Sequence, residues 1–422
     1  MRRLTALFAA VIGVTAVAAC SSTSGSPSSP TNPSAASASC PATPGVTPNT
    51  INLGAMVSVS GVGGTFNGDT QAIEAAVKSQ NAQGGIDGRK IVLSAVDDDA
   101  ATPATNILDA KEMVSEAGVL GIVEFSSAID ASSAYLNSLS VPETGFSNNP
   151  DDMTYDNVFG FNGFQQAPTG TSYTHQLLFG LSAKYLYSKG HKLALLGVDI
   201  PSTPPIQATL TSWFKHFGGQ VVLTESDIPF AQTDFTADVQ RIKASGANVL
   251  ELLMGSAGSI SLLNALQQAG VHLNTVVVSG VYNRSFLTPT DPGLAGTTDP
   301  EDTVPFETNS PELKPYLSSM AKYSGISKTE YESQWVIAGW LSAQLMFYGI
   351  EHAGQCPTRA KVVKALNEST TWDGNGMLAK PINFGYLRKN KLTTSCSYFV
   401  VVNAAGSAWE PASGFAPACL SG

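Results

Sequence analysis

The stretch Asp69–Asp99 reads DTQAIEAAVKSQNAQGGIDGRKIVLSAVDDD, and it decides the fold because it predicts a helix followed by a strand. Apolar residues recur at helical spacing over Asp69–Ala82, and an aspartate at the start of this segment suits a helix cap. The pair Gly84-Gly85 ends the helix. Strands are expected over Lys90–Val96 and, before the helix, over Thr50–Met56. A helix between two strands predicts a parallel strand pair.

The same alternation of strands and helices occurs twice, on either side of a break near Asn157–Ala167. Alternation of this kind predicts a parallel sheet with helices on both faces, and two lobes explain the length better than one oversized sheet. The further expected strands are residues 119–123, 141–146, 192–198, 220–223, 249–254 and 275–279, and the further expected helices are one beginning at residue 103 and those over 131–138, 175–188, 205–217, 235–244 and 260–269.

The pattern changes after Ser279, where helices are expected without intervening strands. This change indicates that the chain returns to a lobe already built, so a discontinuous domain and several crossings between lobes are predicted. Tyr398–Val402 is a candidate strand, and the turn Asn403–Gly406 leads it into a hairpin. The expected helices in this part of the chain are residues 316–323, 331–351 and 358–367.

The composition is that of a globular, acidic protein. The 422 residues carry 23 Lys and Arg against 33 Asp and Glu, a formal net charge of −10. Apolar residues make up 43% and charged residues 13%, which excludes a disordered chain. The sequence has no basic stripe that would meet phosphates, so we expect no nucleic-acid partner. Beyond the N-terminus, no stretch reaches the ~18 consecutive apolar residues of a membrane-spanning helix.

The N-terminus has the order of a secretory signal: the positive Met1-Arg2-Arg3, then the apolar Leu4–Ala19. Val17-Ala18-Ala19-Cys20 resembles a bacterial lipobox, which implies a signal peptide over residues 1–19 and lipid on Cys20. The alternative is an ordinary signal peptide with a chance cysteine. Residues 20–40 are small, polar or proline, so they predict a disordered tether. The expected location is the extracellular face of the cell membrane.

The sequence contains no signature of catalysis or metal binding. It has no Gly-x-Ser-x-Gly, no His-Glu-x-x-His, no phosphate-binding loop and no Cys-x-x-Cys pair. Glu124, Asp199 and Glu251 are isolated acids without an evident partner for acid–base chemistry. We therefore expect no enzymatic activity, no cofactor and no metal. If Cys20 carries lipid, four cysteines remain, which favours two disulfides with three possible connectivities.

Several segments together resemble one family. Asn81–Lys90 (NAQGGIDGRK) is the most specific, Val96-Asp97-Asp98 follows the second strand, and Ser58–Gly61 with Gly68-Asp69 looks like a first ligand loop. From Ile51 to about Tyr282 the chain resembles the periplasmic solute-binding proteins of branched-chain amino acid ABC transporters, which have the type I fold. The lipobox and tether resemble the lipid-anchored Gram-positive, actinobacterial form.

The resemblance implies an α/β fold of two Rossmann-like lobes with parallel sheets, joined by a multi-crossing hinge. Lobe 1 would comprise residues 41–161 and 283–378, and lobe 2 residues 164–280 and 382–419. It further implies a monomer that closes on a small polar solute, an amino acid or a related amide or carboxylate, and delivers it to the permease of an ABC importer. A sensory receptor without a permease and a surface hydrolase are the alternatives, because fold alone does not decide function.

Ligands of open α/β sheets lie beyond the C-terminal ends of the strands, and the resemblance implies the same place here. Ser126-Ser127 and Ser147-Asn148 align with family loops that hold a carboxylate, which a helix N-terminus also favours; the alternative is that they cap helices. Phe66, Phe164 and Tyr282 would wall an apolar pocket or lie in the lobe cores. The implied ligand-binding residues are Ser60, Phe66, Ser126, Ser127, Ser147, Asn148, Phe164, Asp199, Ser202, Gly255, Ser256 and Tyr282.

The sequence departs from the family at one strand end, Met254-Gly255-Ser256, where amino-acid binders usually place an acid that balances the ligand's ammonium. Asp199 or Glu124 would have to replace it, because burying an unpaired ammonium is costly. An amide, an aromatic acid or another small polar solute therefore stays open as the ligand. The resemblance also implies the disulfides Cys40–Cys356 and Cys396–Cys419, each within one lobe.

Overall fold

The computed structural model describes residues 40–60, 66–126, 128, 130–200, 202–288, 292–412 and 416–420. The predicted signal peptide, Cys20 and the tether up to residue 39 lie outside these residues, and so does the predicted site residue Ser127. In the described part of the chain, no helix has the length and apolar character needed to cross a bilayer.

The first sheet contains five parallel strands in the order β2-β1-β3-β4-β5. They are β1 (Thr50–Val57), β2 (Lys90–Asp98), β3 (Gly121–Phe125), β4 (Glu143–Gly145) and β5 (Val158–Gly160). Side chains alternate between the two faces of a strand, so Leu53 and Ala55 of β1 pack in one core and Met56 packs in another. Both faces of this sheet are therefore buried.

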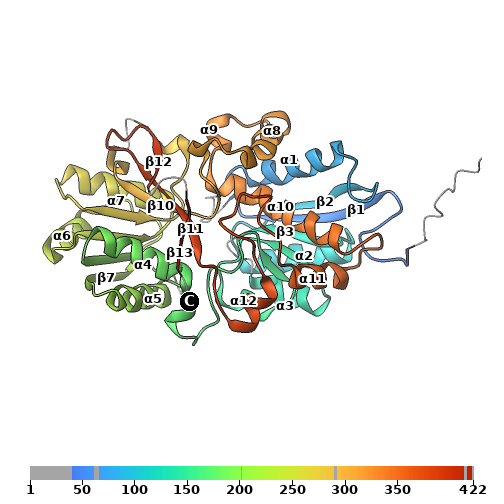
Figure 1. Ribbon diagram of the computed structural model, residues 1–422, viewed down its shortest axis with the longest axis horizontal. Coiled ribbons are helices and arrows are strands. Elements are labelled where there is room, and N and C mark those ends of the chain that lie inside the picture. Colours follow the sequence, from blue (N-terminus) through green and yellow to red (C-terminus); the bar gives the residue numbers. More distant parts are fainter. Residues whose placement is uncertain are drawn as a thin grey trace, which may run out of the picture. The chain divides into compact units, whose positions relative to one another are not determined.

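Helices from two distant parts of the chain build the first lobe together with this sheet (Figure 1). Those that follow its strands are α1 (Asp69–Ala82), α2 (Pro103–Ser115) and α3 (Asp130–Ser138). Those from the later part are α8 (Lys314–Tyr323), α9 (Lys328–Tyr331), α10 (Gln334–His352), α11 (Arg359–Glu368) and α12 (Phe384–Asn390). Helix α10 is apolar around almost its whole circumference because it packs against α1, β3 and β4. The chain thus returns to the first lobe, as its late helices predict.

The second sheet has the order β12-β11-β10-β9-β8-β6-β7, with β13 beside β11. Its strands β6 to β10 are parallel, and β11 and β12 extend it as an antiparallel hairpin. The strands are β6 (Lys192–Val198), β7 (Gln220–Ile228), β8 (Val249–Leu253), β9 (Thr275–Val278), β10 (Thr297–Glu301), β11 (Cys396–Val402), β12 (Trp409–Pro411) and β13 (Ala418–Cys419).

Helices also lie on both faces of the second sheet (Figure 1). They are α4 (Leu177–Lys189), α5 (Thr203–His216), α6 (Thr236–Ser245) and α7 (Ser256–Gln268). Leu193 and Leu195 of β6 pack into the core formed by α4 and α5, whereas Ala194 and Leu196 pack into the core that includes α6 and α7. The predicted α/β class with two sheet-centred lobes and the type I architecture is confirmed.

The lobe boundary after β9 differs from the predicted one. The resemblance implies that residues 283–378 belong to lobe 1, but β10 lies within this range and pairs with β9 and β11 of the second sheet. The return to the first lobe therefore follows Glu301 and not Tyr282. The sequence does not predict this strand because Pro300 and two acids interrupt its pattern, and proline argues against a strand inside a sheet.

The described cysteines all form disulfides. Cys396 is bonded to Cys419, which joins β11 to β13 within the second lobe and is the pairing that the family resemblance implies. Cys40 and Cys356 are each disulfide-bonded as well, and their pairing with one another stays a prediction.

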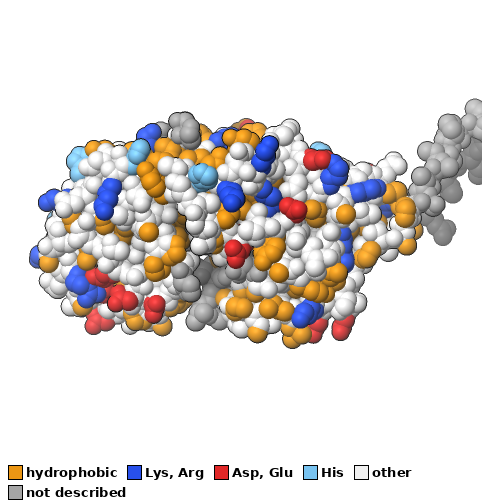
Figure 2. Space-filling model, turned by 90° about the horizontal axis from the view of Figure 1, so that it is seen from below, with side chains coloured by type: hydrophobic (Ala, Val, Ile, Leu, Met, Phe, Trp, Pro, Cys, Tyr) orange, Lys and Arg blue, Asp and Glu red, His pale blue; other side chains and the backbone are white. Residues whose placement is uncertain are grey.

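The surface of the folded part carries charges of both signs. On the face shown in Figure 2, the described Lys and Arg side chains lie apart from one another among neutral residues, with no continuous basic patch.

Candidate functional site

A cleft of about 960 Å³ lies beyond the C-terminal ends of the second-sheet strands. One wall is formed by the residues that follow β6, β7, β8 and β9. The other wall comes from the first lobe, from the start of α1 and from the segment that leads into α10. This is the place where open α/β sheets bind ligands. The lining side chains used below are Gln71, Phe230, Phe235, Met254, Ile260 and Trp335.

The N-terminus of α7 opens into this cleft. Gly255 is the N-cap residue with an extended backbone, and Gly255 and Ser256 both line the cleft. The Ser256 hydroxyl donates to the carbonyl of Gly280, 2.7 Å away, which ties the helix start to the turn after β9. The first N–H groups of a helix have no partner within the helix and carry partial positive charge. The cleft therefore offers backbone donors for a carboxylate or amide oxygen.

The side chains of the cleft are mostly apolar or neutral. Among the described lining residues, Glu330 is the one that carries a charge, and hydrogen bonds from Ser327 lower the pKa of its exposed carboxylate. Amides such as Gln71 and Gln232 and hydroxyls such as Ser333 supply the remaining polar groups. Such a lining suits a solute with an apolar body and a hydrogen-bonding end.

Trp335, the second residue of α10, separates this cleft from a smaller cavity. Its ring packs edge-on against Phe66 at 5.2 Å and Phe146 at 5.4 Å between centroids. A side chain on Gly280 would come within 2.9 Å of the indole, so the glycine lets the ring lie against the turn after β9. Trp335 lines both spaces.

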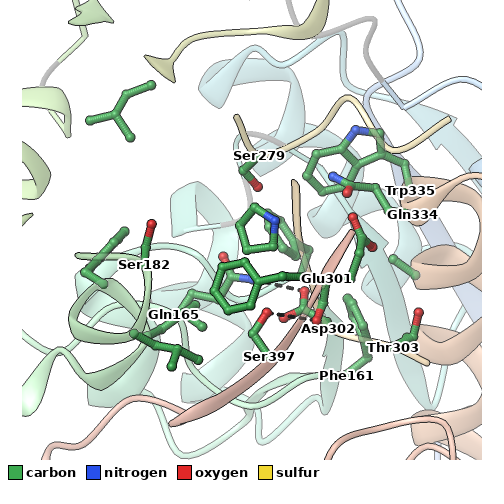
Figure 3. A pocket seen from close by; sticks show the side chains of 18 of the residues that line it. Phe161, Gln165, Ser182, Ser279, Glu301, Asp302, Thr303, Gln334, Trp335 and Ser397 are labelled. Atoms are coloured by element: carbon green, nitrogen blue, oxygen red, sulfur yellow. Dashed lines mark hydrogen bonds between the residues drawn. The ribbon is translucent and has the colours of Figure 1, made fainter. Parts of the chain in front are cut away.

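The smaller space, which we call the acidic cavity, has a volume of about 110 Å³. Three carboxyl groups line it: Glu251 of β8, Glu301 at the end of β10, and Asp302 directly after it. Figure 3 shows Glu301 and Asp302 beside Ser397, Gln165, Gln334 and Trp335. The rings of Phe146, Phe161 and Phe399 complete the walls.

Burial governs the protonation of these acids. Desolvation raises the pKa of Glu251 to about 8, although a hydrogen bond from Ser182 at 2.9 Å opposes the shift. Desolvation raises the pKa of Asp302 to about 6, opposed by a hydrogen bond from Asn162 at 2.8 Å. For Glu301, burial and then the charge of Asp299 raise the pKa. At neutral pH a pKa of about 8 keeps Glu251 mostly protonated, whereas a pKa of about 6 leaves Asp302 mostly ionised.

The predicted carboxylate loops are engaged inside the first lobe. The Ser126 hydroxyl donates to Asp99 and accepts from the N–H of Ala128 at 2.8 Å. The Ser147 hydroxyl donates to Asp152 at 2.8 Å. The carbonyl of Asn148 accepts a hydrogen bond from Gln166. These contacts hold the loops to other residues of the first lobe, and the ligand role predicted for Ser126, Ser147 and Asn148 stays a prediction.

Of the predicted site residues within the described part, Gly255 and Ser256 line the cleft. Phe66 packs beside Trp335 at the back of the cleft wall. Tyr282 and Phe164 lie in the lobe interior: the Tyr282 hydroxyl donates to Glu307 at 2.6 Å, and Phe164 packs on Phe384 and Arg388. Ser60 and Asp199 are exposed and Ser202 is half-buried at the start of α5, outside the cleft lining.

Neither suggested replacement for the missing acid lies in the cleft or the acidic cavity. Asp199 is exposed, and Glu124 is buried in the first lobe, where Asn106 donates to it at 2.7 Å and burial and Glu143 raise its pKa. The acids that do share a cavity are Glu251, Glu301 and Asp302. Glu251 carried one signal in the sequence, an acid within the apolar run VLELL. Glu301, Asp302 and Trp335 had none, because their neighbours come from distant segments.

In the described part of the chain, no cluster of His, Cys, Asp and Glu side chains has an arrangement that could hold a metal ion.

The family model for periplasmic binding proteins matches residues 50–407. The fold is similar to that of a fatty acid ABC transporter substrate-binding protein from Thermomonospora curvata, with a TM-score of 0.70, 21% identity, and 88% of this chain and 94% of that chain covered. It is also similar to a branched-chain amino acid ABC transporter protein from Thermus thermophilus with bound valine, with a TM-score of 0.72, 15% identity, and 88% and 98% covered.

A solute-binding protein from R. palustris in complex with 4-hydroxybenzoate has a TM-score of 0.70 and 19% identity, with 86% of this chain and 95% of that chain covered. No curated protein matches the chain. The matched residues include strands β1 to β11 and the lining of the cleft. The chain therefore belongs to the periplasmic binding protein family, whose members work outside the cytoplasm.

Proposed function

We propose that this protein captures a small organic solute in the cleft between its lobes and delivers it to the permease of an ABC importer. The observation that carries the proposal is the cleft itself, where the α7 N-terminus and the strand ends of one lobe face α1 and Trp335 of the other. The structures from Thermomonospora curvata and R. palustris are named as a substrate-binding protein and a solute-binding protein of ABC transporters, which supports the delivery step.

The lining of the cleft supports a solute with an apolar body and a carboxylate or amide end. Phe230, Phe235, Met254 and Ile260 supply apolar surface, and α7 supplies donors for an oxygen. Valine, fatty acids and 4-hydroxybenzoate, which the names of the relatives mention, all combine an apolar body with a carboxylate. The proposed substrate class is therefore a small amino acid or a related amide or carboxylic acid.

A thermal-shift panel of branched-chain amino acids, their amides, aromatic acids and short fatty acids tests the proposal. At least one solute should raise the melting temperature, because ligand that binds only the native state stabilises it. The variant Phe230→Ala should weaken binding of that solute about tenfold. Leu108→Ala is the matched control: both side chains are about half exposed, but Leu108 lies on α2, away from the cleft. If no solute in the panel stabilises the protein, the proposal fails.

We also infer that the protein releases its bound solute chemically unchanged, as expected of a binding protein and not an enzyme. Solute released by denaturing the complex should have its original mass by mass spectrometry. A modified product that accumulates with time would instead support the hydrolase alternative.

The same proposal includes a lipid anchor on Cys20 and a single-copy, monomeric receptor at the outer face of the membrane. The lipobox-like Val17–Cys20 supports the anchor. Cells that express Cys20→Ser should release the protein into the medium, whereas the wild type should stay in the membrane fraction. Equal distribution of the two would contradict the anchor.

A further inference from the structure

The acidic cavity contains carboxyl groups that the protein does not neutralise. Among the described residues that line it, none is Lys, Arg or His. Glu301 and Glu251 are only 2% and 6% exposed, so water does little to screen them. Because a buried carboxylate without a counter-charge is costly, these groups must hold protons or meet a cation from outside.

The hydrogen-bond partners of Glu301 leave one of its oxygens open. The Gln334 amide, oriented so that its oxygen accepts from the Gly280 N–H at 2.8 Å, donates to Oε1 of Glu301. No hydrogen bond from the described residues reaches the second oxygen of this carboxyl group. The oxygen belongs to a side chain that is buried and lines the cavity (Figure 3). This oxygen can accept a hydrogen bond from a molecule that enters the cavity.

The carboxyl groups of Glu251 and Asp302 accept few hydrogen bonds from the described residues. Glu251 accepts one hydrogen bond, from the hydroxyl of Ser182 at 2.9 Å. Asp302 accepts from the amides of Asn162 at 2.8 Å and Gln165 at 3.3 Å, both on the same oxygen. All of these donors are neutral, so none of them balances a negative charge.

The other walls suit an organic cation better than a metal ion. Phe146, Phe161, Phe399 and Trp335 line the cavity, and aromatic rings attract ammonium groups through their negative faces. In the described residues no acid, His or Cys cluster is arranged to ligate a metal. An apolar cavity of about 150 Å³ holds one benzene molecule, so a cavity of about 110 Å³ has room for a slightly smaller group.

We propose that the acidic cavity binds the cationic head of a small organic ammonium compound, a primary or methylated ammonium of about five non-hydrogen atoms. This inference deepens the proposed function, on which it rests for the rest of the solute, because Trp335 forms the wall between the cavity and the cleft. The cavity supplies the acid that the strand end Met254-Gly255-Ser256 lacks. As the ammonium enters, one carboxyl group releases its proton to the buffer and becomes its counter-ion.

Calorimetric titration with tert-butylammonium chloride tests the inference, with tert-butanol as a neutral probe of nearly the same shape. The cation should bind at least tenfold more tightly than the alcohol, because charge-assisted hydrogen bonds exceed neutral ones. The heat at pH 7 should differ between buffers of different ionisation enthalpy, which reports the released proton. Glu301→Gln and Glu251→Gln should each weaken the cation about tenfold and leave the alcohol unaffected.

Asp109→Asn is the matched control, since this acid on α2 also has a pKa raised to about 6 but lies outside the cavity. It should leave both affinities unchanged. Equal affinity for the two probes, or cation binding that survives both Glu variants, would overturn the inference. If Glu301→Gln does not fold, the cation affinity of Glu251→Gln and the proton release of the wild type still test the inference.

The outcomes also separate this inference from the proposed function. If panel solutes bind in the cleft with affinities sensitive to Phe230→Ala but the ammonium probe does not bind, the inference is wrong and the function stands. If the ammonium probe binds and depends on Glu301 while no complete solute does, the cavity is a cation site and the proposed function fails.

Discussion

Replacing Glu251 with glutamine should change how the stability of the protein depends on pH. Glu251 is buried in the acidic cavity, and desolvation raises its pKa from 4.5 to about 8. Between these values the native protein keeps the proton while the unfolded chain releases it, so the unfolded chain binds fewer protons. The free energy of unfolding must therefore fall as pH rises through this interval.

The size of the effect follows from the same two values. Each pH unit in the interval lowers the free energy of unfolding by about 1.4 kcal/mol. The whole interval from 4.5 to about 8 therefore lowers it by up to about 5 kcal/mol. Glutamine fills almost the same space, can still meet the Ser182 hydroxyl, and does not titrate. Glu251→Gln should accordingly lose much less stability between pH 5 and pH 8, and at pH 8 it should be more stable than the wild type.

Urea unfolding followed by circular dichroism at pH 5, 6.5 and 8 gives the required free energies. Asp109→Asn serves as the control, because its pKa of about 6 confines its effect to lower pH. If wild type and Glu251→Gln lose stability in parallel from pH 6.5 to pH 8, Glu251 does not hold a proton there and the account of the acidic cavity is wrong.

Three other substitutions test the fold. Gly145→Ala would place its Cβ 1.7 Å from the carbonyl oxygen of Glu124 in the neighbouring strand. We therefore expect the free energy of unfolding to fall by about 3 kcal/mol or more and the melting temperature to fall with it; an unchanged melting temperature would contradict the strand spacing. Cys396→Ser should lower the free energy of unfolding by about 3 kcal/mol by the chain-entropy model, because the disulfide to Cys419 joins residues separated by 23 positions in the sequence. A urea midpoint equal to that of the oxidised wild type would refute this. Arg388→Lys should lower the free energy of unfolding by about 2–4 kcal/mol, because the half-buried Arg388 donates through its guanidinium to two backbone carbonyls. Urea unfolding measures this, and a loss below about 0.5 kcal/mol would show that lysine replaces it.

Local sequence patterns identified most of the elements that build the two lobes. The helix predicted over Asp69–Ala82 has these bounds in the structure, and the strand predicted from Lys90 begins there. These elements are readable because the spacing of apolar residues along the chain directly reflects which face is buried. The sequence did not predict β10, because Pro300 lies within it. One of the two strands that pair with β10 is β11, which comes from the C-terminal part of the chain, so no local pattern indicates the pairing.

The residues predicted at strand ends also differ in how far the sequence could place them. The strand end Met254-Gly255-Ser256 was identified from sequence, since any C-terminal strand end followed by a helix points to the ligand edge of the sheet. The serines at other strand ends looked equivalent, and only the tertiary structure showed that Ser126 and Ser147 bond within the first lobe.

The sequence by itself determined the class of elements, their order and the two-lobed α/β organisation, because backbone periodicity and turn residues act over a few positions. Only the tertiary structure decided which acids share a cavity. Glu251, Glu301 and Trp335 lie on β8, β10 and α10, and they meet because the chain passes from one lobe to the other and back. Burial and the resulting shift of a carboxyl pKa arise from such distant neighbours, which no local pattern encodes.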